Sequence, residues 1–342
     1  MVRRRHIERA CVLGGNGFIG GWVAAELRSR GIEVTIADRR ARDGVHSIGG
    51  DLCGEQLARA LAERSIEVVF DFAGHADVPR SFEAPLDTLE ENTSAAVRRL
   101  EALRTMPKPP LYVYASSAAV YGNVSQLPIA ETQTASPLSP YAVAKLAGEQ
   151  YVDFYHRSYG VPAISLRMFS VYGPAQRKQA VYDLITRAWE PGPVLEISAP
   201  RTVSRDFIFV GDVARATVDL AERAPAAGEV FNLASGRETT MGELAGTILG
   251  VTGVRKRVSF AGALRPGDPG RYVGSTERLD ALGIALSTPL HEGVRQTADW
   301  LTGAGRLTRE AHGARSHRRA HHPVGEAPAV ELAVAREHGF RG

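Results

Sequence analysis

Short apolar runs alternate with amphipathic stretches along the first half of the chain. Residues 7–13, 33–37, 67–72 and 111–115 form compact apolar runs of the length expected for buried β-strands. Between these runs, apolar side chains recur at helical spacing, most clearly at positions 86, 89, 96, 97, 100 and 103. This alternation predicts an α/β protein with parallel strands.

Asn92 lies in the middle of the helical stretch 86–103. Asparagine is a modest helix former, because its side chain competes for the hydrogen bonds of the backbone. We therefore expect Asn92 to interrupt the helix and to make hydrogen bonds rather than to pack in a core.

A glycine-rich turn follows the first predicted strand. Residues 14–20 read Gly-Gly-Asn-Gly-Phe-Ile-Gly, and a helical pattern continues over 22–30. The glycines allow a tight turn, a close approach of backbone amides to a pyrophosphate, and packing of the helix on the strand. The turn therefore predicts a dinucleotide site, with contacts expected from Gly14, Asn16, Gly17, Phe18, Ile19 and Gly20.

Asp38 ends the second predicted strand, about twenty residues beyond the glycines, where such folds bind the ribose hydroxyls of the cofactor. A carboxylate at this place repels a 2′-phosphate, which favours NAD over NADP. Arg39 and Arg40 follow, and an arginine here also suits a 2′-phosphate, so NADP stays open as an alternative.

A candidate acid/base group stands at the start of a later helix. Tyr141 and Lys145 are four residues apart, so a helix places their phenol and ammonium on one face. We expect the ammonium, with an oxidised nicotinamide, to lower the tyrosine pKa from its usual value of about 10. Ser117 follows the strand 111–115 and offers a hydroxyl to the reacting oxygen. Alone, the tyrosine–lysine spacing is typical of an ordinary surface pair, so the prediction depends on all three residues.

Composition excludes several other classes of function. The chain has 342 residues, 44% hydrophobic and 23% charged, which is ordinary for a globular protein of one or two domains. A net charge of +3 gives no indication of nucleic-acid binding. No apolar run approaches the roughly 18 residues of a membrane span, and no separate apolar segment marks the N-terminus, so we expect a cytoplasmic protein. Two cysteines are too few for a disulfide framework.

Taken together, these motifs resemble the extended short-chain dehydrogenase/reductase family, in its nucleotide-sugar epimerase and dehydratase branch. The resemblance extends from about residue 7 to residue 301. It is carried, in chain order, by GGNGFIG, SSAAVYG, SPYAVAKLAGE, LRMFSVYGP, SRDFIFVGDVA and RPGD.

The resemblance implies NAD as cofactor and a catalytic trio of Ser117, Tyr141 and Lys145. Further cofactor contacts are implied for Asp51, Leu52, Phe72, Ala73, Gly74, Asn92, Lys145 and Phe169. Arg205 and Arg265 are expected to hold the diphosphate of the substrate. Other substrate contacts are implied for Arg80, Ser117, Tyr141, Ser170, Arg177 and Asp268.

The fold implied by the resemblance is a doubly wound parallel Rossmann sheet with a smaller α/β substrate domain. We expect residues 1–170, with a return segment 205–235, to form the NAD-binding domain. Residues 171–204 and 236–302 would form the substrate domain. The family also implies a homodimer, built from the helices at 86–103 and 141–159 of each subunit as a four-helix interface.

Ala118 and Ala119 indicate which reaction follows. Relatives that are 4,6-dehydratases or decarboxylases carry carboxylates at these places, and without one the abstraction of the C5 proton loses its base. We therefore expect a 4-epimerase, in which Tyr141 takes the C4 hydroxyl proton, hydride passes to NAD, and a transient 4-keto sugar turns and is reduced on its other face. An NAD(P)H-dependent reductase and a non-enzymatic NAD sensor are the alternatives.

Ser170 and Arg177 bear on the identity of the sugar. Ser170 stands where hexose epimerases commonly have Asn and UDP-glucuronate 4-epimerases have Thr. Arg177 resembles the second arginine of their GPRQRPDMA block and suits a bidentate contact with a C6 carboxylate. We expect UDP-glucuronate. Departures from that block at 175, 178 and 179 leave UDP-glucose and UDP-N-acetylglucosamine as alternatives.

From Gly303 onward the composition shifts to Arg, His, Ala and Gly, and the resemblance ends. A histidine cluster in this segment would suit a metal, but its few large apolar side chains favour a solvated extension. We assign it no function and expect no metal.

Overall fold

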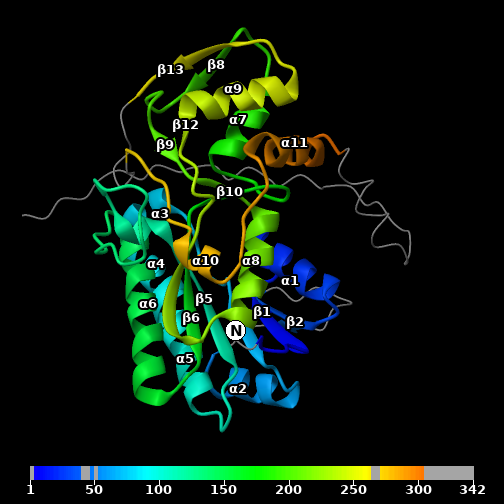
Figure 1. Ribbon diagram of the computed structural model, residues 1–342, viewed down its shortest axis with the longest axis vertical. Helices are drawn as coiled ribbons and strands as arrows, with labels where there is room; N and C mark the ends of the chain where they lie inside the picture. Colours follow the sequence, from blue (N-terminus) through cyan, green and yellow to red (C-terminus); the bar gives the residue numbers. More distant parts are fainter. Residues whose placement is uncertain (1–3, 40–46, 50–52, 263–269, 304–342) are drawn as a thin grey trace, which may run out of the picture.

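The computed structural model describes residues 4–39, 47–49, 53–262 and 270–303 (Figure 1). A seven-stranded sheet forms its centre, in the order β3-β2-β1-β4-β5-β6-β11, and all neighbouring strands are parallel. The order reverses between β1 and β4, which places a ligand crevice at the carboxyl ends of these two strands. The strands are β1 (Arg9–Leu13), β2 (Glu33–Asp38), β3 (Ser47–Gly49), β4 (Val68–Asp71), β5 (Leu111–Ser117), β6 (Ala163–Met168) and β11 (Ala227–Leu233).

Each central strand contributes side chains to two hydrophobic cores, because successive side chains point to opposite faces of a sheet. Val12 packs in the core that contains α1 and α8, whereas Cys11 and Leu13 belong to the core that contains α2, α5 and α6. Helices therefore cover both faces, which confirms the doubly wound parallel sheet. These helices are α1 (Phe18–Ser29), α2 (Gly54–Glu63), α5 (Ala95–Arg104), α6 (Pro140–Tyr159) and α8 (Val210–Arg223).

A second group of elements lies beyond the carboxyl edge of the sheet, at the top of Figure 1. It contains three two-stranded sheets, which pair β10 with β7, β12 with β9, and β13 with β8. Its apolar side chains join the core of the large sheet on the α1 and α8 side. The elements are β7 (Ser170–Tyr172), α7 (Ala180–Trp189), β8 (Val194–Ile197), β9 (Ser204–Arg205), β10 (Phe207–Phe209), β12 (Thr239–Thr240), α9 (Met241–Thr252), β13 (Arg257–Phe260) and α11 (Leu290–Leu301). Helix α10 (Glu277–Ala281) lies against β11 of the large sheet, where Arg278 donates to the Val230 carbonyl at 2.7 Å.

Two helices differ from the sequence pattern. Helix α1 begins at Phe18, inside the glycine motif, rather than at residue 22, because Gly17 already serves as its N-cap. The stretch 86–103 is divided into α4 (Pro85–Leu89), a π-helical turn (Glu90–Ser94) and α5. Asn92 lies in this wide turn, so the expected interruption is confirmed.

Membrane spans, metal sites and the C-terminal tail can be addressed only as far as the described residues extend. Within the described ranges, no helix is both long and apolar enough to cross a membrane. The same residues hold no cluster of three or more His, Cys, Asp or Glu side chains suited to a metal. The tail from 304 lies outside the described residues.

Candidate active site

The glycine motif forms a cradle at the carboxyl end of β1. Gly14 has φ of 72°, and a Cβ there would lie 2.8 Å from the carbonyl oxygen of Phe72. A Cβ on Gly20 would collide with the Gly14 carbonyl. Neither position tolerates a side chain, so the backbone of this turn, which leads into the N-terminus of α1, is open to a phosphate.

Asp38 closes the other side of the cradle. It ends β2 next to the glycine turn, and the Asn16 amide donates to its Oδ2 atom at 3.2 Å. Arg39, the next residue, is exposed. A glycine cradle beside a strand-end carboxylate fits a dinucleotide with free ribose hydroxyls, so these residues suit NAD.

The loop after β4 lies beside the cradle. Ala73 is held by a 3.1 Å hydrogen bond from its amide to Asp71 Oδ1. Asn92 packs against Gly74, where a Cβ would lie 2.8 Å from Asn92 Oδ1. The Asn92 amide group donates to the His75 carbonyl at 3.3 Å and to the Thr88 carbonyl at 3.1 Å. Its Oδ1 atom is buried and has no hydrogen-bond partner among the described residues.

Ser117 and Tyr141 come together at the carboxyl end of β5. Ser117 is the last residue of the strand, and its hydroxyl accepts from the Ala119 amide at 3.2 Å. Tyr141 lies in the first turn of α6, which Ser139 caps by accepting from the Ala142 amide at 3.2 Å. The side chains of Tyr141 and Ser117 are hydrogen-bonded to each other. The structure thus joins two of the three predicted catalytic residues directly.

Lys145 lies one turn further along α6 and is buried. Its ammonium donates to the Ala115 carbonyl at 2.9 Å and lies 5.1 Å from the centre of the Tyr114 ring. Burial lowers the pKa of Lys145 to about 8, although Asp71 and Glu149 oppose this shift. Lys145 is therefore on the same helix face as Tyr141, with its ammonium bound to the strand that carries Ser117.

Burial raises the pKa of Tyr141 within the protein alone, and the hydrogen bond with Ser117 only partly offsets that change. The sequence prediction concerned the combined effect of the Lys145 ammonium and an oxidised nicotinamide, and it did not reveal that both side chains are desolvated. Within the protein alone, Tyr141 is a neutral phenol at pH 7.

The residues expected to bind substrate are spread over several loops. Arg80, on α3 (Val78–Glu83), forms an ion pair with Glu91 at 3.0 Å. Ser170 starts β7 directly after the buried Phe169. Arg205, on β9, donates to the Ser204 carbonyl at 2.8 Å. The structure does not bring these three residues into contact with one another.

Arg177 differs from these residues. It follows β7, is exposed, and forms no hydrogen bond or ion pair within the part of the chain that the structure describes. The next residue, Lys178, binds the Ala76 carbonyl at 3.0 Å and Asp77 at 3.2 Å. The predicted contacts Asp51, Leu52, Arg265 and Asp268 lie outside the described residues.

Sequence reasoning missed two buried ion pairs around this site. Asp71 binds Arg99 at 2.8 Å, and Glu149 binds Arg167 at 2.6 Å. Both carboxylates raise the pKa of Lys145. The available signal was the position of Glu149, four residues after Lys145 and so on the same helix face.

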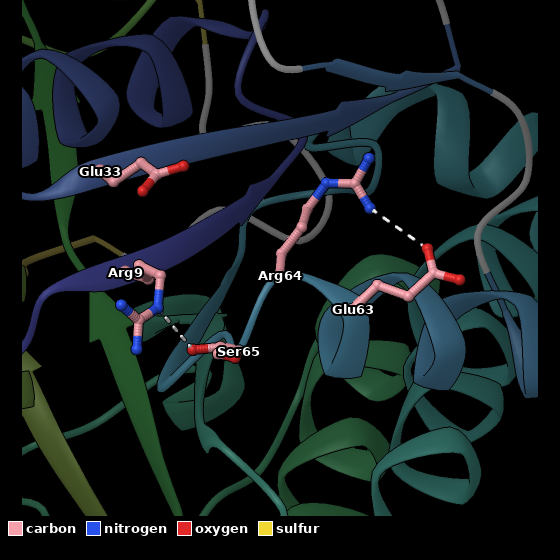
Figure 2. A pocket seen from close by; sticks show the side chains of 5 residues that line it. All are labelled: Arg9, Glu33, Glu63, Arg64 and Ser65. Carbon is pink, nitrogen blue, oxygen red and sulfur yellow. Dashed lines mark hydrogen bonds and ion pairs between the residues drawn. The ribbon is translucent and has the colours of Figure 1, made fainter.

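A polar hollow of about 570 Å³ lies at the opposite edge of the sheet (Figure 2). It is lined by Arg9, Glu33, Glu63, Arg64 and Ser65, near the amino ends of β1 and β2. Arg9 Nε donates to the Ser65 carbonyl at 3.1 Å, and Arg64 lies 4.0 Å from Glu63. Most of these residues are exposed. The hollow is therefore a solvated surface feature, remote from the carboxyl edge where the cradle and Tyr141 lie.

Comparison with known proteins identifies the family of the chain and structures with a similar fold. The model of the NAD dependent epimerase/dehydratase family matches residues 10–234. A putative UDP-glucose 4-epimerase of Methanocaldococcus jannaschii is 28% identical, over 85% of this chain and 97% of its own. UDP-glucuronate 4-epimerase 2 of Arabidopsis thaliana is 29% identical, over 88% of this chain and 77% of its own. MoeE5, solved with UDP-glucose and NAD and with UDP-glucuronic acid and NAD, has a TM-score of 0.78 and 31% identity, covering 86% of this chain and 99% of that one.

Proposed function

Since the chain belongs to the NAD dependent epimerase/dehydratase family, we propose that it interconverts UDP-glucuronate and UDP-galacturonate by inverting carbon C4. The broader activity, an NAD-dependent nucleotide-sugar 4-epimerase, has the support of the family match and of relatives named as UDP-sugar 4-epimerases. The choice of a uronate is the finer part of the proposal, and Arg177 is the observation that carries it.

The surroundings of Ser117 favour epimerisation over elimination. Ala118 and Ala119 follow it and offer no carboxylate to abstract a proton from C5. Two nearby carboxylates, Asp71 and Glu149, are held in buried ion pairs by arginines. Their oxygens are occupied by these arginines and buried, so they are not open to a sugar carbon.

Three residues of the chain take part in removing and returning the proton of the C4 hydroxyl group. The glycine cradle and Asp38 would hold NAD, which would supply a reversible hydride acceptor for C4. Tyr141 acts as a base only in its phenolate form, which a bound, positively charged nicotinamide and the Lys145 ammonium would favour; the phenolate then takes the C4 hydroxyl proton and gives it back in the reverse step. Ser117, already hydrogen-bonded to this phenol, holds the same sugar oxygen. Lys145 is the cation that the chain itself supplies, and its positive charge favours loss of the phenol proton.

Arg177 supports a substrate with a carboxylate. Its guanidinium is exposed beside β7 and has no partner in the described ranges, so its forked donors are available to a ligand. The 4-keto uronate is a β-keto acid that loses CO₂ readily when its carboxylate aligns with the ketone. A bidentate grip on the carboxylate opposes this loss.

The experiment is a substrate panel with purified protein. UDP-glucuronate, UDP-glucose and UDP-N-acetylglucosamine are each incubated with the enzyme, and NMR follows inversion at C4 and release of CO₂. We expect inversion of UDP-glucuronate without CO₂ release. Inversion of the neutral sugars alone would refute the uronate proposal. Stoichiometric consumption of NADH with release of a reduced sugar would instead indicate a reductase.

The same proposal includes a division of labour along the chain. Residues 1–170 and 205–235 bind the cofactor, and residues 171–204 and 236–302 bind the UDP-sugar. The small sheet that pairs β13 with β8 lies wholly within the second group of residues and beyond the carboxyl edge of the large sheet, which supports this division. Limited proteolysis should then show that UDP protects the second group of residues and that NAD protects the first.

We also propose a homodimer through α4 and α6. Large apolar side chains are exposed on these helices, including Leu86 at 76%, Val143 at 53% and Tyr159 at 48%. A second copy of the chain would cover this face in a four-helix interface. Light scattering should give twice the chain mass, and Leu86→Glu should give the mass of one chain. A monomeric wild-type protein would contradict the proposal.

A further inference from the structure

A buried carboxylate lies one helical turn beyond Lys145. Glu149 is 5% exposed and belongs to α6. Tyr141, Lys145 and Glu149 follow at intervals of four residues, so they occupy one face of this helix. That face points to the carboxyl ends of β5 and β6, and none of the roles derived so far uses Glu149.

Glu149 binds both strands at once. Arg167 on β6 donates to it with Nε at 3.0 and 3.1 Å and with Nη2 at 2.6 Å. Ser116 on β5 donates its hydroxyl to Glu149 Oε1. Ser116 and Arg167 face each other in the register of the two strands, so one carboxylate is enough to reach both.

Arg167 is itself held in place. Its Nη1 donates to the Glu131 carbonyl at 3.3 Å, and its guanidinium lies 4.7 Å from the centre of the Tyr121 ring. Tyr121 in turn donates to Asn232 on β11 at 2.6 Å. The ion pair is therefore anchored to the far edge of the sheet and has little freedom to shift.

These contacts bear on the distance between the first turn of α6, which carries Tyr141, and the carboxyl end of β5, which carries Ser117. Ser117 directly follows Ser116, and Tyr141 lies two turns before Glu149 on a single rigid helix. Any movement of α6 relative to β5 would change the separation of the Ser117 hydroxyl from the Tyr141 phenol. The bond from Ser116 to Glu149 opposes this movement.

We infer that Glu149 is a positioning residue, whose carboxylate fixes the Tyr141 phenol and the Lys145 ammonium relative to the Ser117 hydroxyl. The inference rests on the proposed function, because these groups handle the proton in the C4 inversion. Glu149 touches neither sugar nor cofactor in this role and acts through Ser116 and the helix.

Glu149 also affects the charge of Lys145. The groups that act on the Lys145 ammonium are Asp71 on β4, Arg99 on α5 and Glu149 on its own helix, around the ring of Tyr114. Loss of the Glu149 charge would lower the Lys145 pKa further below about 8. A positioning role therefore has a titration signature that packing alone would lack.

The test compares Glu149→Gln with Asp219→Asn. Asp219 forms a similar ion pair with Arg30, at 2.8 Å, between α1 and α8 and away from the site. We expect Glu149→Gln to lower kcat about 10- to 100-fold, as for a misplaced reacting group, with KM within threefold. The alkaline limb of its kcat profile should move to lower pH. Asp219→Asn should lose stability and keep kcat.

Two further variants separate positioning from folding. Ser116→Ala keeps the ion pair and removes only the bond to β5, so it should fold normally and still lower kcat about tenfold. In the double variant Glu149→Gln with Arg167→Gln, no buried charge is left unpaired, so Tm should recover while kcat stays low. A double variant that regains full kcat would show a purely structural role and overturn the inference, as would a Ser116→Ala variant with wild-type kcat.

One readout needs no turnover. ¹³C-labelled lysine titrations, assigned with Lys145→Met, should show a lower Lys145 pKa in Glu149→Gln than in the wild-type protein. An unchanged titration would refute the inference even in an active enzyme. If the wild-type protein inverts no UDP-sugar but Glu149→Gln still shows the lower Lys145 pKa, the proposed function is refuted and the link between Glu149 and Lys145 remains supported.

Discussion

The buried part of the candidate site and its exposed rim are built in opposite ways. Tyr141 and Lys145 are each 7% exposed, and the protein holds each with a hydrogen bond. Arg177 is exposed and has no partner among the described residues. Proton transfer requires fixed distances, whereas a charge that meets a ligand must stay available. If the proposed function holds, the residues that carry out the reaction are buried in this chain, and the residue that selects the substrate is exposed.

The largest expected loss of activity comes from removing the buried Tyr141 hydroxyl. Tyr141→Phe removes the phenol oxygen and keeps the ring, so kcat should fall about 10³-fold, as for loss of a general acid/base. NMR detection of C4 inversion measures this change. Tyr151→Phe, on the exposed side of the same helix, should leave kcat unchanged. Full turnover by Tyr141→Phe would remove the mechanism.

Lys145→Met should separate stability from activity. The pKa of Lys145 is about 8 in the folded protein, against an ordinary lysine value of 10.5, so burial of the ammonium costs about 3 kcal/mol at pH 7. This cost is fully present below pH 8 and is relieved as the pH rises from 8 to 10.5. The inactive variant should therefore unfold at higher denaturant at pH 7, and its advantage should vanish near pH 10.5. A less stable variant at pH 7 would contradict this expectation.

Arg177→Gln tests the exposed end. A charge-assisted contact with a carboxylate is worth about 1.5–3 kcal/mol, so kcat/KM for UDP-glucuronate should fall about 10- to 100-fold. The value for UDP-glucose should stay within twofold. Lys178→Gln is the matched control, because this neighbouring cation is already bound to Asp77. Equal losses with both sugars would show that Arg177 does not recognise a carboxylate.

Asp38→Asn should have the smallest effect. It keeps the shape of the residue beside the Asn16 amide and removes the charge that repels a 2′-phosphate. We expect NAD affinity to fall several-fold and NADP affinity to rise, in line with one weakened hydrogen bond. Calorimetric titration with both cofactors measures the ratio. An unchanged ratio would place cofactor selectivity elsewhere.

Motifs that lie within one short segment could be predicted from the sequence, whereas contacts between residues far apart in the chain could not. The glycine turn, Asp38 and the Tyr141 helix each lie within one short segment, so residue spacing was enough to predict them. The partnership of Glu149 with Arg167 depends on the register of β6 against β5, which no local pattern encodes. The desolvation of Tyr141 was missed for a related reason, because burial by residues from several elements cannot be inferred from four residues of one helix.

The π-helical turn at Glu90–Ser94 changes the angular position, around the helix axis, of the apolar side chains of α5 relative to those of α4. In an unbroken helix, Leu89 and Leu100 would lie near the same side, yet one is 43% exposed and the other fully buried. Five residues wound at the looser π pitch delay the rotation by about a quarter turn. The apolar residues of α4 can therefore face a second molecule while those of α5 pack on the sheet. Deletion of one residue from the turn should make it impossible for both sets to keep these positions.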